Sequence, residues 1–151
     1  MASEQYPTAV SGGCLCGSVR YKVTFPSSHD WGRGVTITSP SGLHMLIHLR
    51  SAQHVNAPNV STLSRYHATP DAARGFCTKC GSWLFWCNEQ SNSMSMSVGT
   101  FDQEELKQWG QKLAYSEVHL WYEDAIEGIS DQLPGEKWKY HDKGEGAEKI
   151  G

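Results

Sequence analysis

CLCG at residues 14–17 and CTKCG at residues 77–81 each hold two cysteines around a tight turn that a glycine follows. Such a turn aims both sulfurs at one point, and the glycine lets backbone N–H groups face the sulfurs. Two pairs of this kind predict a tetrahedral zinc site with four thiolate ligands, Cys14, Cys16, Cys77 and Cys80. Because no position is left for water, this one zinc ion is expected to be structural and to tie the start of the chain to the strand after Cys80. Buried thiols or a redox pair are the alternative.

Length and composition limit the class of protein. The 151 residues suffice for about one domain, and 38% apolar with 19% charged residues predict a chain that folds alone. The net charge of −3 argues against nucleic acid or an anionic membrane as partners. The chain has no apolar stretch of roughly 20 residues and no signal-peptide pattern at its start, so we expect a cytoplasmic protein. In that reducing compartment the fifth cysteine, Cys87, is expected to be an inert core residue.

Hydrophobic patterning predicts the secondary structure. Alternation predicts strands over 18–25, 43–50, 93–98 and 117–122, and the doubly apolar stretch 82–87 predicts a central strand. In 93–98 the methionines point inward and the serines outward. One helix is expected within 100–114, beginning with a capping box of Asp102 and Glu105 and ending at Gly110. The expected fold is mainly β, made of small antiparallel sheets with one short helix; the domain spans 1–135, and 136–151 form a polar, loosely held tail.

Four stretches carry a family resemblance: GGCLCGSVRYKV at 12–23, RGFCTKCGSWLFW at 74–86, VGTFD at 98–102 and, more weakly, VHLWYEDAIEGISDQLP at 118–134. On these stretches the chain resembles the glutathione-dependent formaldehyde-activating enzymes, also called the centromere protein V family. The resemblance implies a β-tent fold and a first zinc held by the four cysteines of the two pairs. It also implies a carbon–sulfur lyase activity that depends on a second, catalytic zinc.

The motif for that second zinc is missing. In the family, a C-x-C-x-x-C motif lies between the two cysteine pairs and is followed by a short segment that ends in Ser-Gly. Placing that Ser-Gly on residues 41–42 puts the three cysteine positions at Gly32, Gly34 and Ile37. None of these residues can bind a metal, so the chain is expected to be a divergent member without the catalytic metal.

A pocket without its metal can bind an organic ligand instead. We expect acid–base catalysis by His29, His44 or His48, with Arg50 stabilising an enolate or a carboxylate. His44 and His48 share a strand face about 13 Å apart at 3.3 Å per residue, so they cannot hold one small atom together. The candidate substrate-binding residues are Trp31, Arg33, Trp83, Phe85, Trp86, Trp121 and Tyr122. A solvated strand face and ordinary core tryptophans are the alternatives.

The function expected from these residues is that of a small-molecule lyase or isomerase of the cyclase type. It would isomerise, cyclise, dehydrate or eliminate from an organic substrate, such as a secondary metabolite, by metal-independent acid–base chemistry and without an organic cofactor. Two alternatives stay open: a carbon–sulfur lyase acting on glutathione adducts as in the parent family, and a non-catalytic protein that binds a ligand or partner. A homodimer also stays open, because the Met/Ser strand could lie at a sheet edge.

Overall fold

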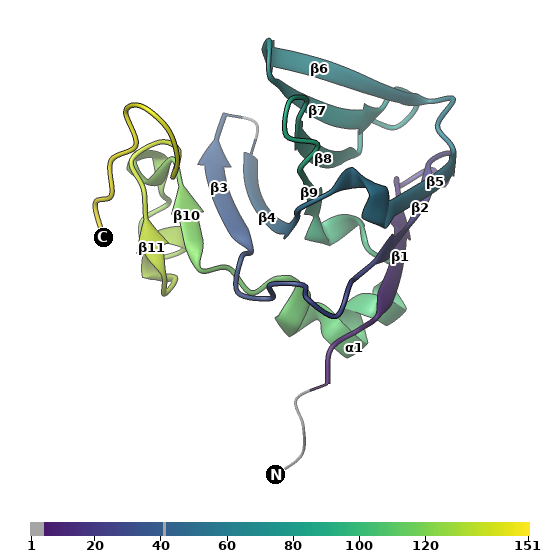
Figure 1. Ribbon diagram of the computed structural model, residues 1–151, viewed down its shortest axis with the longest axis horizontal. Helices are drawn as coiled ribbons and strands as arrows, with labels where there is room; N and C mark the ends of the chain where they lie inside the picture. The colour runs from purple at the N-terminus through teal and green to yellow at the C-terminus, as the bar shows by residue number, and fades with distance from the viewer. Residues whose placement is uncertain (1–4, 41) are drawn as a thin grey trace.

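The computed structural model describes residues 5–40 and 42–151 and contains two β-sheets and one α-helix (Figure 1). The smaller sheet has the order β1-β2-β5, from Ala9–Gly13, Arg20–Thr24 and Val55–Asn59. The larger sheet has the order β11-β10-β3-β4-β9-β8-β7-β6. Its strands are Glu136–Lys137, Val118–Leu120, Val35–Ser39, Gly42–Leu49, Met94–Ser97, Trp83–Asn88, Ala72–Cys77 and Leu63–Thr69, in that order. The mainly β prediction with one helix is therefore confirmed.

Most strands pair with a chain neighbour, and the exceptions are the pairs β2–β5, β4–β9 and β10–β3. Most pairs are antiparallel, as expected, but β10 pairs in parallel with both β3 and β11. β3 and β10 are far apart in sequence, and hydrophobic alternation carries no information about which distant strand becomes a neighbour. In Figure 1, β10 and β11 form the left edge of the molecule, whereas β1, β2 and β5 lie to the right.

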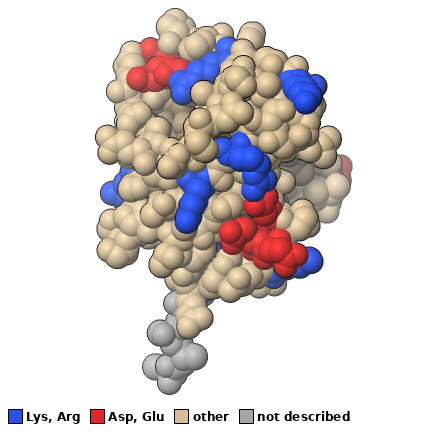
Figure 2. Space-filling model, turned by 90° about the vertical axis from the view of Figure 1, so that its right-hand side faces the viewer, with Lys and Arg blue, Asp and Glu red and all other residues tan. Residues whose placement is uncertain are grey.

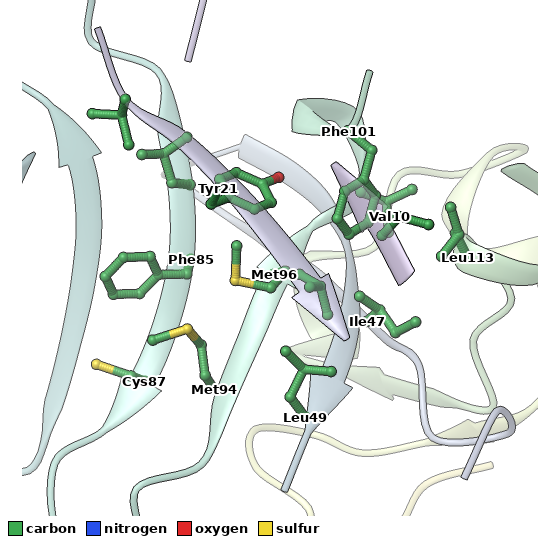
Figure 3. Close-up of a cluster of buried hydrophobic side chains, with 14 of the residues drawn as sticks. Val10, Tyr21, Ile47, Leu49, Phe85, Cys87, Met94, Met96, Phe101 and Leu113 are labelled. Carbon is green, nitrogen blue, oxygen red and sulfur yellow. The ribbon is translucent and has the colours of Figure 1, made fainter. Parts of the chain in front are cut away.

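Side chains from both sheets meet in one core (Figure 3). Val19, Tyr21, Val23 and Phe25 are all buried, as the alternation of 18–25 predicts. Met94 and Met96 are buried too, together with Leu84 and Phe85 on opposite faces of β8. The prediction that the serines of 93–98 point outward is wrong for Ser95, which is 4% exposed because the strand lies between β4 and β8.

The helix α1 spans Gln103–Leu113, one turn longer than expected. Gly110 does not end it, because Leu113 is completely buried and that burial favours a further turn. Asp102 is the N-cap, but its side chain makes no cap hydrogen bond. It binds the Arg20 guanidinium instead, with Nη1 donating to Oδ1 at 2.8 Å, while Glu105 accepts from the backbone N–H of Ser11 at 3.0 Å. Both capping-box side chains thus hold α1 against the smaller sheet.

The C-terminal segment is attached to the larger sheet. β11 pairs with β10, and Trp138 forms an isolated antiparallel bridge with Lys149. The N–H of Ile150 donates to the carbonyl of Lys137 at 2.8 Å. The expectation of a loosely held tail is wrong here, because side-chain polarity does not reveal backbone pairing. We refer to residues 138–149, which this bridge closes, as the C-terminal loop.

Charged residues are spread over the surface in small groups. On the face shown in Figure 2, Lys and Arg side chains lie beside Asp and Glu side chains, with uncharged surface between the groups. Within the described residues, no helix has the length and apolar character that crossing a membrane requires.

Candidate functional site

The four paired cysteines lie together where the two sheets meet. Cys14 and Cys16 follow β1, Cys77 is the last residue of β7, and Cys80 lies in the turn between β7 and β8. All four sulfurs are within 4.8 Å of one another, with Cys14 Sγ 3.5 Å from Cys16 Sγ and Cys16 Sγ 3.8 Å from Cys77 Sγ. Zinc–sulfur bonds of about 2.3 Å in a tetrahedron require sulfur–sulfur distances of about 3.8 Å. The residues therefore fit one zinc ion held by four thiolates.

Neighbouring groups favour the thiolate form at this cluster. Thr62 lowers the pKa of Cys77, and Ser82 lowers the pKa of Cys80 to about 5, both through side-chain hydrogen bonds to sulfur. Burial has the opposite effect on Cys14 and raises its pKa. Gly17 and Gly81 have φ angles of 75° and 76°, which side chains disfavour, so the glycine after each pair allows the turn. The groups that lower these two pKa values thus favour the deprotonated form of cysteine, which is the form that binds zinc.

A separate pocket of about 280 Å³ lies beside β4. Its walls come from the β2–β3 loop, the end of β4, the short 3₁₀ helix Ala52–His54 and the C-terminal loop. The lining residues are Pro26, Ser28, His29, Asp30, Arg33, His48, Arg50, His54 and Lys143. Three imidazoles and three permanent cations thus meet in one concave site, a combination suited to proton transfer and to binding negative charge.

His48 is the pocket residue with the best defined orientation. It lies directly opposite Ser95 across the β4–β9 pair, and its Nδ1 is 3.1 Å from Ser95 Oγ. Nδ1 is thus occupied by a buried partner, which leaves Nε2 for a ligand. Burial lowers the pKa of His48 below its usual 6.5, and the charges of Lys143 and Arg33 lower it further. His48 is therefore neutral at pH 7 and can act as a base.

His29 also lines the pocket. Its ring packs between Phe25, at 4.8 Å, and Trp31, at 4.5 Å. Burial lowers its pKa, although Asp30 opposes the shift. Its buried Nε2 has no hydrogen-bond partner among the described residues, so this imidazole is held by packing and not by a polar partner.

Comparison with known proteins assigns the family. The family model for the glutathione-dependent formaldehyde-activating enzyme matches residues 9–124. The chain belongs to this family. A crystal structure of a Rhodobacter sphaeroides protein shares the fold with a TM-score of 0.50 and 17% identity, over 72% of this chain and 97% of that one. No curated protein matches the chain significantly.

Family members are lyase-type enzymes, so the scaffold is that of an enzyme. Within 5–40 and 42–151, the four-cysteine cluster is the one group of three or more His, Cys, Asp or Glu side chains close enough to share a metal ion. Gly32 and Gly34, two of the positions compared above with the second cysteine motif, lie close to residues 115–117. A Cβ at Gly34 would overlap the carbonyl oxygen of Tyr115, and a Cβ at Gly32 would lie 2.8 Å from the Glu117 carboxylate. At Gly34 the backbone packs too tightly for a cysteine side chain, whereas at Gly32 the contact is the end of the flexible Glu117 side chain, which can move.

The predicted site residues of this family member separate into three groups. His29, Arg33, His48 and Arg50 line the pocket, and Trp31 supports His29 from behind. His44 lies outside the pocket, with its ring 4.2 Å from that of Trp83. The remaining aromatic candidates are also elsewhere: Phe85 is in the core, Trp86 is on β8 opposite Arg74, Trp121 packs on Tyr140, and Tyr122 donates to the Asp131 carbonyl.

His54 and Lys143 were not anticipated as pocket residues. His54 ends a three-residue 3₁₀ helix whose N-cap, Ser51, accepts from the Gln53 N–H at 3.2 Å, and no hydrophobic period marks so short an element. Lys143 belongs to a segment with many charges, where its side chain is indistinguishable in sequence from solvated neighbours. The high histidine content was the one signal available for His54.

Proposed function

We propose that this family member is a small-molecule lyase or isomerase, of the cyclase type, that moves protons on an organic substrate in the pocket beside β4. The observation that carries the proposal is the position of His48, oriented by Ser95 and surrounded by two further imidazoles and three cations. The reactions open to this arrangement are isomerisation, cyclisation, dehydration and elimination.

The chemical roles follow from position and charge. His48 Nε2 takes a proton from a carbon next to a carbonyl group, and the Arg50 guanidinium stabilises the enolate that forms. His54, in its protonated form, returns a proton to another carbon or to a leaving oxygen, and exchange with solvent then restores both imidazoles. Proton removal and return balance, so the step needs no oxidant and no organic cofactor.

The zinc ion has a separate role in this proposal. When bound to the four cysteines it has no open coordination position, so it supplies folding free energy and no Lewis acid chemistry. The cysteines join the turn after β1 to the turn after β7 and thereby hold the smaller sheet to the larger one.

The test is a product search with wild-type protein and the His48→Gln variant. Each is incubated in D₂O with an extract of small organic molecules and analysed by mass spectrometry. We expect either a product that is isomeric with its precursor and carries deuterium at carbon, or a product that is lighter by one water. His48→Gln should lower its formation by about 10²-fold or more, the usual contribution of a general base. Equal product formation by the variant would reject the proposal.

A second assay separates this proposal from the parent chemistry. Wild-type protein is mixed with glutathione and formaldehyde, and hemithioacetal formation is followed by NMR. We expect the rate to equal that without protein. An accelerated rate would favour the carbon–sulfur lyase alternative.

A further inference from the structure

Three permanent cations reach the pocket from distant parts of the chain. Arg33 comes from the loop before β3, Arg50 follows β4, and Lys143 lies in the C-terminal loop. Asp30 is the one carboxylate among the nine lining residues. Asp142 offsets part of the charge of Arg33, with 3.7 Å between Asp142 Oδ2 and Arg33 Nη2. The pocket thus keeps an excess of positive charge.

Lys143 differs from the other lysines that follow β10. Lys139 pairs with Glu123 and Glu148, Lys149 pairs with Glu136, and Lys137 donates to the Asp131 carbonyl. Within residues 5–40 and 42–151, the structure gives Lys143 no ion pair or hydrogen bond, and the same holds for Arg50. Two of the three cations that line the pocket, Arg50 and Lys143, are therefore unpaired among the described residues.

The C-terminal loop holds Lys143 at this position. The bridge between Trp138 and Lys149 closes the loop, and the N–H of Ala147 donates to the carbonyl of Gly144 in a turn next to Lys143. The pair of Asp142 with Arg33 attaches the loop to the segment before β3. The loop lies beyond residues 9–124, the part that matches the family model.

We propose that the pocket binds a carboxylate of the substrate between Arg50 and Lys143, and that the C-terminal loop is the specificity element for this anion. The inference rests on the proposed function, since it names the substrate class of the same pocket. A carboxylate suits the site better than a phosphate group, because none of the nine lining residues belongs to α1 and no helix N-terminus offers aligned N–H groups.

The test measures binding without turnover. Benzoate, its neutral analogue benzamide, and inorganic phosphate are titrated separately into the zinc-loaded protein, and the imidazole resonances of His48 and His29 are followed by NMR. We expect saturable shifts with benzoate alone. Two results would overturn the proposal: binding of benzamide with the same affinity as benzoate, or binding of phosphate without binding of benzoate.

Matched variants assign the binding to the loop. Lys143→Gln should weaken benzoate binding about fivefold or more, and Lys143→Arg should retain it. Lys22→Gln removes the same charge from the exposed side of β2 and should leave the affinity within about twofold. Equal affinities for Lys143→Gln and Lys22→Gln would overturn the role of the loop.

The outcome is independent of catalysis. If benzoate binding depends on Lys143 while His48→Gln turns over substrate normally, the anion site stands and the acid–base function fails. If His48→Gln abolishes turnover while benzoate does not bind, the function stands and the carboxylate assignment fails.

Discussion

Ser95 shows how one buried side chain can set the chemistry of another. It stands opposite His48 in the β4–β9 register and is nearly inaccessible to solvent. Strand alternation placed it on the outer face, but the outer face of a central strand is covered by neighbouring structure. His48 itself could be proposed from sequence as an acid–base residue, whereas its partner and the nitrogen left free for a ligand required the pairing of two strands.

Ser95→Ala tests this positioning. The variant removes the hydroxyl group that bonds to Nδ1 of His48, so we expect both tautomers of this imidazole to become populated. The free energy of unfolding should fall by about 1 kcal/mol because one hydrogen bond is lost. The ¹⁵N shifts of the His48 ring report the tautomers directly, and kcat should fall with KM nearly unchanged. Ser95→Thr, which keeps the hydroxyl, should restore the ring shifts. Wild-type ring shifts in Ser95→Ala would contradict the positioning role.

The secondary structure elements were predictable where a local pattern decides them. The alternation of 18–25 predicted its buried face, and that of 93–98 predicted the buried methionines but not the burial of Ser95. The ends of α1 were not predictable in this way. Asp102 and Glu105 have capping-box spacing, but Arg20 and the Ser11 N–H, both distant in sequence, compete successfully for the two carboxylates.

Leu113→Ala tests why α1 continues past Gly110. Leu113 is fully buried, so truncation should lower the free energy of unfolding by about 2–5 kcal/mol, as measured by urea denaturation. Gln111→Ala, an exposed change in the same turn, should alter it by less than about 0.5 kcal/mol. Similar effects of the two substitutions would show that packing of this turn does not extend the helix.

At the scale of the whole molecule, the pocket depends on segments that no single pattern links. The sequence predicts catalytic or binding roles for His29, Arg33 and His48, which lie on one loop and one strand. Lys143 lines the same pocket because the C-terminal segment returns to the sheet through β11. The aromatic candidates Trp121 and Tyr122 lie outside the pocket, where residues of that same segment pack against them. The path of the chain, and not the residue type, decides which candidate residues reach the pocket.

The pocket also predicts a pH dependence of stability. Burial lowers the pKa of both His29 and His48 below 6.5, so the unfolded chain binds more protons than the folded chain just below that pH. The free energy of unfolding should therefore be constant with respect to these groups above about pH 6.5 and should fall as the pH is lowered through the window beneath it.

The measurement is urea unfolding of zinc-saturated protein between about pH 8 and about pH 5. The difference between wild type and His48→Gln isolates the contribution of His48 from proton competition at the cysteines, and the variant should show the shallower decline. A steeper decline in the variant would mean that protonation of His48 stabilises the fold.

The central proposal is that this enzyme scaffold binds one zinc ion, held by the four cysteines as a structural metal, and that the chemistry occurs in the separate pocket. Metal content per chain, determined by elemental analysis of untagged protein, tests it most directly. We predict one zinc per chain in the wild type, none in Cys80→Ser, and one in Cys87→Ala, whose sulfur lies outside the cluster. Two zinc ions per chain, or one retained in Cys80→Ser, would contradict the claim.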